Sequence, residues 1–218
     1  MQPGNTEKGR FYTFEGLDGC GKTTQINRLA NFLADNGRDY LLLREPGGTM
    51  IGEEIREILL RPRATEMVAE TELLLFAAAR AQLVREVIRP ALTRGTIVIS
   101  DRFTDSTLAY QGGGRGLPTD LLDRINELAT DGCRPELTFY LWIPPDHTDE
   151  RLARRATTAE CEGDRIEQAT IDFRYGVYAR YEELAERDRT RIKRIDATQS
   201  IEAVWQNIEK IIREDLQL

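Results

Sequence analysis

The chain has 218 residues, 31% of them charged, and a formal net charge of −7. This length fits one domain with a sizeable core, and the negative charge argues against broad nonspecific binding to nucleic acid. No apolar run approaches the length that spans a membrane, and the polar first ten residues lack the apolar stretch of a signal peptide. We expect a chain that binds neither membranes nor nucleic acid, with residues 1–10 as a short disordered lead.

The cysteines indicate a reducing compartment. Cys20, Cys133 and Cys161 are odd in number and far apart, without C-x-x-C spacing. This pattern argues against a disulfide framework and against a zinc site. We therefore expect a cytoplasmic protein.

Strand and helix patterns alternate along the chain. Apolar runs typical of strands are FYTFE (11–15), YLLLR (40–44), TIVISD (96–101), LTFYLWI (137–143) and RIKRID (191–196). Helical patterns occur at 22–36, 52–60, 69–93, 104–111, 118–131, 147–156, 170–187 and 200–215. This alternation predicts an α/β fold, with a five-stranded parallel sheet flanked by helices on both faces. Within a single domain, 11–218, the charged and apolar-poor segment 151–167 is typical of a small lid.

A glycine-rich segment, EGLDGCGKTT (15–24), connects the first predicted strand to the first predicted helix. Gly16, Gly21, Lys22 and Thr23 match the spacing G-x-x-x-x-G-K-[ST] of a phosphate-binding loop. Glycines let backbone N–H groups point inward at a helix N-terminus, where Lys22 adds a positive charge and Thr23 a hydroxyl for Mg²⁺. The alternative is a glycine-rich turn without a ligand. The strand before the loop and the helix after it favour a phosphate site.

A second candidate, Asp101, ends the apolar run TIVISD. Ligands of open α/β sheets collect at the carboxyl ends of the strands, where an acidic side chain could assist Mg²⁺. The sequence SDRFTDS also permits Asp101 to cap the next helix. The residues alone leave both interpretations open.

Together with further motifs, this loop resembles the thymidylate kinase family. The resemblance runs from about residue 11 to the C-terminus. It includes REPGGT (44–49), LLLFAAARAQL (73–83), SDRFTDSTLAYQGGGRG (100–116), RPELTFYLWI (134–143), GDRIEQ (163–168) and DATQS (196–200). It implies a P-loop nucleoside-monophosphate-kinase fold with a small lid, usually in a homodimer. The implied reaction is phosphorylation of dTMP to dTDP by ATP with Mg²⁺, in dTTP synthesis.

The resemblance assigns residues to the donor nucleotide and the metal. Asp18 is expected to face the acceptor sugar or the metal, and Glu45 to orient metal-bound water. The positions implied for ATP are Gly16, Asp18, Gly19, Cys20, Gly21, Lys22, Thr23, Thr24, Ala197 and Thr198. The positions implied for the metal are Thr23, Asp18, Asp101 and Glu45.

The resemblance also assigns an acceptor site. Arg44, Arg56 and Arg102 would surround the phosphate of dTMP. Phe76 would stack on thymine, Arg80 donate to its O4, and Tyr110 crowd C2′ against ribose. The full set implied for dTMP is Asp18, Glu45, Pro46, Arg56, Phe76, Arg80, Arg102, Thr107, Tyr110 and Gln111.

Several of these residues have a simpler interpretation. By pattern alone, Phe76 in its apolar run is more typical of core packing. Tyr110 and Gln111 precede three glycines, which suit close approach of the backbone to a ligand, but they could instead cap a helix. Glu45 could form an exposed ion pair with Arg44.

The lid distinguishes two forms of the family. The variable positions of the phosphate loop, 17–20, carry no basic residue, whereas the lid segment carries several arginines. This resembles the bacterial form, in which the lid supplies the catalytic cation. TTAECE lengthens the segment between Arg155 and Gly163, so which lid arginine acts stays open. The implied catalytic set is Lys22, Glu45, Arg102, Arg151, Arg154 and Arg155.

Two other functions share a phosphate loop. A GTPase switch module would need an N-K-x-D motif, which the sequence lacks. A deoxynucleoside kinase would need a carboxylate base against the sugar hydroxyl, a role that Glu45 could imitate. A phosphate monoester is already charged near neutral pH, so dTMP needs no such base.

Overall fold

The computed structural model describes residues 9–61, 66–148 and 170–218. Within these ranges the strands form a five-stranded, all-parallel sheet in the order β2-β3-β1-β4-β5. The strands are β1 (Phe11–Glu15), β2 (Tyr40–Arg44), β3 (Ile97–Asp101), β4 (Leu137–Trp142) and β5 (Ile192–Asp196). The predicted sheet is therefore confirmed, with each strand within one residue of its expected bounds.

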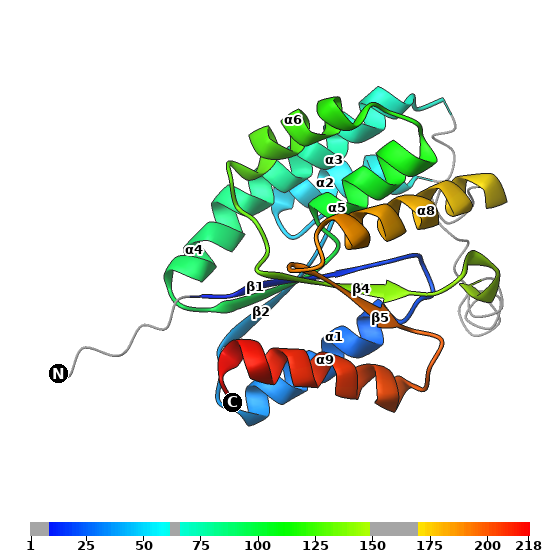
Figure 1. Ribbon diagram of the computed structural model, residues 1–218. Helices are drawn as coiled ribbons and strands as arrows, with labels where there is room; N and C mark the ends of the chain where they lie inside the picture. The colour runs from blue at the N-terminus through cyan, green and yellow to red at the C-terminus, as the bar shows by residue number, and fades with distance from the viewer. Residues whose placement is uncertain (1–8, 62–65, 149–169) are drawn as a thin grey trace.

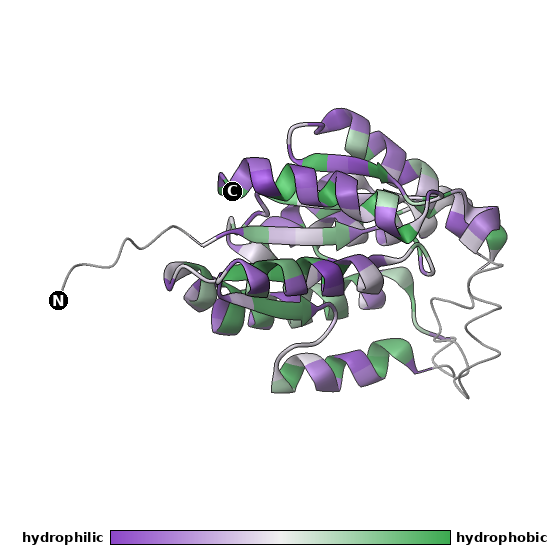
Figure 2. Cartoon of the chain, turned by 90° about the horizontal axis from the view of Figure 1, so that it is seen from below, coloured by the Kyte–Doolittle hydropathy of each residue, from purple (hydrophilic) through white to green (hydrophobic). Residues whose placement is uncertain are grey.

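Helices cover both faces of the sheet (Figure 1). Helices α1 (Lys22–Asp35) and α9 (Ile201–Leu216) pack on one face, and their apolar residues share a core with β1, β3 and β4. The remaining helical segments are α2 (Met50–Leu60), α3 (Ala69–Leu83), η1 (Val84–Ile88), α4 (Arg89–Thr93), α5 (Thr104–Thr107), η2 (Leu108–Gly114), α6 (Thr119–Thr130) and α8 (Ile171–Arg187). Purple and green alternate along the surface helices in Figure 2, as expected of helices with one apolar side.

Two of the predicted helices are interrupted. The helix expected over 69–93 is observed as α3, η1 and α4, and η1 is a π-helical turn just before Pro90. Proline has no N–H to donate to the carbonyl four residues earlier, so the regular hydrogen-bond ladder cannot continue through it. The helix expected over 104–111 becomes π-helical at η2, which contains Tyr110 and Gln111. These two residues therefore lie inside a helical segment and do not cap one.

The glycines after Gln111 serve the packing of η2 on α8. A Cβ added at Gly113 would lie 2.3 Å from the carbonyl oxygen of Gly176, and one at Gly114 would lie 2.4 Å from the ring of Phe173. The expected close approach is real, but its partner is helix α8 instead of a ligand. This close packing fixes the position of η2 against α8.

None of the helices in the described ranges is long and apolar enough to cross a bilayer. The predicted lid at 151–167 and most of the lead at 1–10 fall outside the described residues. So do Arg151, Arg154, Arg155 and most of the helix expected at 147–156.

Candidate functional site

The phosphate loop lies at the carboxyl end of central strand β1 and leads directly into α1. Gly16, Gly19 and Gly21 have φ angles of 132°, 79° and 104°, in a region that other residues rarely adopt. The Lys22 Nζ atom lies 3.2 Å and 3.1 Å from the carbonyl oxygens of Gly16 and Leu17. The expected geometry is thus present, with a buried lysine at a helix N-terminus inside a loop of glycines.

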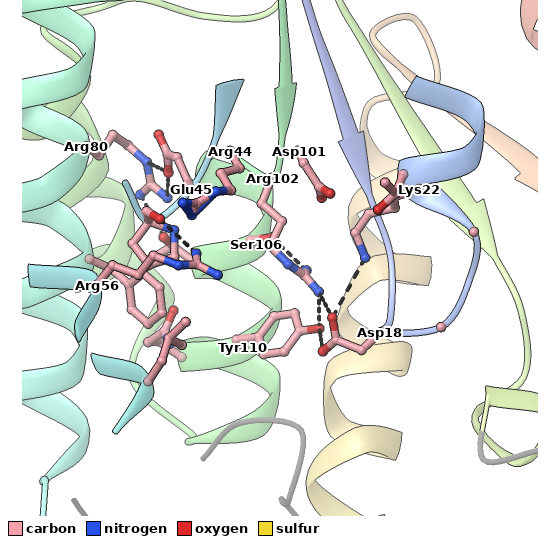
Figure 3. Close-up of a pocket in the computed structure, with 18 of the residues that line it drawn as sticks. Asp18, Lys22, Arg44, Glu45, Arg56, Arg80, Asp101, Arg102, Ser106 and Tyr110 are labelled. Atoms are coloured by element: carbon pink, nitrogen blue, oxygen red, sulfur yellow. Dashed lines mark hydrogen bonds and ion pairs between the residues drawn. The ribbon is translucent and has the colours of Figure 1, made fainter. Parts of the chain in front are cut away.

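Arg102 reaches the same loop from the end of β3. Its Nη2 atom donates to Asp18 at 2.7 Å and to the Tyr110 hydroxyl at 2.9 Å, while Nη1 donates to Gly16 and Ser106. Figure 3 shows Asp18, Lys22, Arg102 and Tyr110 converging. Burial alone would raise the pKa of Asp18, but the charges of Arg102 and Lys22 outweigh it and lower that pKa. Asp18 is therefore an ionised link between the two cations.

The backbone of Arg102 is held in an unusual conformation. Its φ is 75°, a left-handed value that costs a non-glycine residue of order 1–3 kcal/mol. The N–H of Arg102 donates to the carbonyl of Phe14, and the next N–H, of Phe103, donates to Glu15 at 2.7 Å. This framework fixes the direction in which the Arg102 side chain leaves the strand.

Glu15 is a buried carboxylate that sequence reasoning did not identify as part of the site. Besides the bond from Phe103, it accepts from the hydroxyls of Ser106 at 2.6 Å and Tyr181 at 2.7 Å. Burial, followed by the charge of Asp105, raises its pKa to about 7. The available signal was an acidic residue at the end of the apolar run FYTFE, the same signal that identified Asp101.

Two further carboxylates lie at the carboxyl ends of neighbouring strands: Glu45 directly follows β2, and Asp101 is the last residue of β3. Asp101 Oδ1 and Glu45 Oε1 are buried and have no hydrogen-bond partner within residues 9–61, 66–148 and 170–218. Helix α5 has no side-chain cap, so Asp101 is not the helix cap that the sequence permitted. Unpartnered carboxylate oxygens beside a phosphate loop are suited to a cation and its bound water.

Glu45 is paired with Arg80 and not with Arg44. Its Oε2 atom lies 2.8 Å from Arg80 Nε and 2.6 Å from Arg80 Nη2, and the side chains are 4% and 2% exposed. Burial raises the pKa of Glu45 even though Arg80 acts against the shift. Arg44 instead pairs with Glu53 at 3.0 Å at the surface. The proposed Arg44–Glu45 ion pair is therefore wrong.

Arg80 is enclosed by protein acceptors on every side. In addition to Glu45, it donates to Thr107 Oγ1 at 2.7 Å, Asn126 Oδ1 at 2.9 Å and the carbonyl of Phe103 at 3.0 Å. These contacts occupy all the N–H groups of the guanidinium. A contact with thymine O4 would have to share one of them.

The loop, the arginines and the carboxylates border one cavity of about 660 Å³, a volume typical of small-molecule sites. Phe76 lines its wall partly exposed, so it is not the core residue that its pattern favoured. Leu60 and Ser106 also line it, although the sequence did not mark them. The predicted residues on the wall are Asp18, Gly19, Gly21, Lys22, Thr23, Thr24, Arg44, Glu45, Pro46, Arg56, Phe76, Arg80, Asp101, Arg102, Thr107, Tyr110 and Gln111.

Among the predicted residues that the structure describes, four do not line this cavity. Cys20 is buried beneath the loop, and Gly16 contributes carbonyl contacts to Lys22 and Arg102. Ala197 and Thr198 follow β5, where Thr198 donates hydrogen bonds to Asp196.

Arg56 does line the cavity, where it donates to the carbonyl of Pro46 at 2.9 Å.

No group of three or more His, Cys, Asp or Glu side chains able to hold a metal occurs in residues 9–61, 66–148 and 170–218. This does not conflict with a Mg²⁺ site, because Mg²⁺ is usually bound by one or two carboxylates together with substrate phosphates and water.

Known proteins give a consistent comparison. The Thymidylate kinase family model matches residues 14–208. A thymidylate kinase from Kosmotoga olearia is 46% identical over 92% of this chain and 93% of its own length. One from Geobacillus sp. is 48% identical, over 91% and 93%. The crystal structure of thymidylate kinase from Ehrlichia chaffeensis is 32% identical and superposes with a TM-score of 0.73, covering 94% of this chain and 98% of that one.

Proposed function

The chain belongs to the thymidylate kinase family and phosphorylates dTMP to dTDP, and we propose that the cavity carries out this transfer from ATP with Mg²⁺. The observation that carries the proposal is the convergence on one cavity of a phosphate loop, Arg102 and two carboxylates, each with one oxygen that has no hydrogen-bond partner among the described residues. A single cavity can hold donor and acceptor phosphates in line, and positioning is the main requirement of phosphoryl transfer.

The donor side is the phosphate loop. Backbone N–H groups of the loop and the start of α1 bind the ATP phosphates, and Lys22 offsets charge on the transferred group. Lys22 now lies against carbonyl oxygens of its own loop, weak partners that a phosphate would replace. We assign Ala197 and Thr198, beyond this cavity, to the nucleoside of ATP, by resemblance alone.

The acceptor side is the wall formed by α3, α5 and η2. Arg102 and Arg56 bind the phosphate of dTMP, with Arg44 at the rim. Phe76 supports the base, next to Arg80, Thr107 and Gln111. Tyr110, hydrogen-bonded to Arg102, borders the sugar.

Mg²⁺ would be held by Thr23 and Asp101, with Glu45 acting through bound water. The fit rests on the buried, unpartnered oxygens of Asp101 and Glu45. When bound, the ion neutralises charge on the donor phosphates. The acceptor phosphate is itself the nucleophile, since its second pKa lies near 6, and no side chain has to remove a proton.

The lid arginines complete the proposal. Arg151, Arg154 and Arg155 lie outside the described residues. We propose that they supply the second cation, which the variable positions 17–20 of the phosphate loop do not provide. If one of them acts in the transition state, its Ala variant lowers kcat more than it raises the KM for dTMP. An effect on KM alone would assign these residues to uniform binding.

We also propose that two copies of the chain associate in the cytoplasm. The proposal rests on the resemblance and on Met50, Ile51 and Ile58 of α2 and Leu74 of α3, which are exposed apolar side chains on neighbouring helices. Sedimentation of the purified chain tests this, and a monomer at micromolar concentration would contradict it.

A coupled ADP-release assay over nucleosides and nucleoside monophosphates tests the reaction. We expect turnover with dTMP and none with thymidine. Turnover of nucleosides would instead support a deoxynucleoside kinase, with a carboxylate as base. Binding of ATP without any turnover would support a switch module.

Lys22→Ala tests the donor side. Because one electrostatic stabiliser of this kind is typically worth about 10²–10³ in rate, we expect a loss of that size with little change in melting temperature. Near-normal activity of the folded variant would remove Lys22 from the mechanism.

A further inference from the structure

Gln111 lies on the cavity wall with its amide held from behind. Its Nε2 atom donates to Glu72 Oε1 at 2.7 Å, and both residues are almost fully buried, at 2% and 1% exposure. The amide oxygen of Gln111 has no partner among residues 9–61, 66–148 and 170–218. A carboxylate only accepts hydrogen bonds, so the NH₂ end must face Glu72 and the oxygen end is left for the cavity.

Glu72 is itself fixed. Arg115 Nη2 lies 2.9 Å from Glu72 Oε2, its Nε donates to Oε1 at 3.2 Å, and its guanidinium stacks on the ring of Phe173. The cationic partner keeps Glu72 as an acceptor. The amide of Gln111 therefore cannot flip without placing its oxygen, an acceptor, against the carboxylate of Glu72, which is also an acceptor.

The neighbouring hydroxyl of Thr107 presents a donor to the cavity, whereas Gln111 presents an acceptor. Thr107 Oγ1 accepts from Arg80 at 2.7 Å, which leaves the Thr107 proton free to donate. The wall thus presents an acceptor on Gln111 and a donor on Thr107.

We propose that Glu72 is a specificity-positioning residue, which sets the cavity to accept a 4-keto pyrimidine and to reject a 4-amino pyrimidine. The inference rests on the proposed function, in which the base lies on this wall. A 4-keto pyrimidine carries a proton on N3 and an acceptor at O4, while a 4-amino pyrimidine carries an acceptor at N3 and a donor at N4. Only the first pattern complements an acceptor on Gln111 beside a donor on Thr107.

The direct test is Glu72→Gln. The new amide can donate to the oxygen of Gln111, so the amide of Gln111 can flip and present its NH₂ group to the base. We therefore expect the kcat/KM ratio of dTMP over dCMP to fall about tenfold. The ratio of dTMP over dUMP should stay unchanged, because thymine and uracil share N3–H and O4. A wild-type dTMP/dCMP ratio in the folded variant would overturn the proposal.

A double-mutant cycle separates this role from a general structural one. If Glu72 acts through Gln111, adding Glu72→Gln to Gln111→Ala should change the dTMP/dCMP ratio no further. An equal fall in that background would overturn the proposal. Arg115→Lys is the matched control, since it keeps a cation beside Glu72 and should keep the ratio.

Two safeguards keep the result interpretable. If Glu72→Gln does not fold, Glu72→Met tests the same point, since methionine fills similar space but cannot hold the amide of Gln111. If the wild-type chain does not phosphorylate dTMP, the proposed function fails. If it prefers dTMP and Glu72→Gln keeps that preference, only this inference fails.

Discussion

Arg102 and Arg80 line the same cavity, yet they are held very differently (Figure 3). The side chain of Arg102 is 17% exposed, and its partner Asp18 is 31% exposed. The side chain of Arg80 is 2% exposed and its partner Glu45 4%. Arg102 contacts the phosphate loop, whereas Arg80 contacts the buried side chains of Glu45, Thr107 and Asn126.

The difference shows that a charge on a binding wall is not always free to bind. A ligand phosphate can replace Asp18, the solvent-accessible partner of Arg102. Replacing the partners of Arg80 would leave a buried carboxylate unpaired, which is costly. Arg102 is therefore suited to hold a ligand, and Arg80 to hold Glu45 and Thr107 in place.

Removing Arg102 should have the largest effect on activity. Arg102→Met keeps much of the aliphatic stem and removes the donors, so we expect kcat/KM for dTMP to fall by about 10²–10³. The melting temperature should change little, because Asp18 remains near Lys22 and solvent. Steady-state kinetics and thermal melts measure both. Wild-type kcat/KM would abolish the distinction between the two arginines.

Removing Arg80 should mainly destabilise the fold. Arg80→Met leaves Glu45 buried without its partner, which typically costs about 3–5 kcal/mol and lowers the melting temperature by roughly 6–20 °C. If Arg80 also reads the base, kcat/KM for dTMP falls tens- to hundreds-fold with much less loss for dCMP.

Arg44→Met is the matched control for this variant. It breaks the exposed pair with Glu53 and should hardly change the melting temperature. If the two variants melt alike, the framework role of Arg80 is wrong. An unchanged dTMP/dCMP ratio in Arg80→Met would show that Arg80 does not select the base.

The smallest effect concerns Glu15, which anchors the backbone beside Arg102. The folded chain keeps the Glu15 proton to a pKa of about 7, while the unfolded chain releases it near 4.5. This stabilisation is complete below pH 4.5 and is lost as the pH rises to 7, by roughly 3 kcal/mol at most.

Glu15→Gln cannot titrate, so its free energy of unfolding should rise relative to wild type over this pH window. Thermal melts at pH 4.5 and 7.5 measure the change, and contributions from Glu45 cancel because both proteins share it. Parallel pH profiles would show that Glu15 does not titrate in this range.

The sequence by itself determined the sheet and the phosphate loop. Strands 11–15 and 40–44 were predicted with their observed bounds, because both are short apolar runs bounded by charged residues and turns. Lys22 and the loop glycines lie between a strand and a helix as predicted, because the loop is local and its geometry is fixed by consecutive residues. Asp101 lies at the predicted end of a strand, because a strand end is also readable from sequence.

The tertiary structure alone decided which partner each charged residue takes. Glu45 adjoins Arg44 in sequence but pairs with Arg80, and Glu72 pairs with Arg115 and Gln111 from another element. Gly113 and Gly114 allow η2 to approach α8 closely. Such pairings depend on how helices pack across the sheet, and burial makes them strong because water no longer competes for the charges. No pattern along the chain encodes that burial.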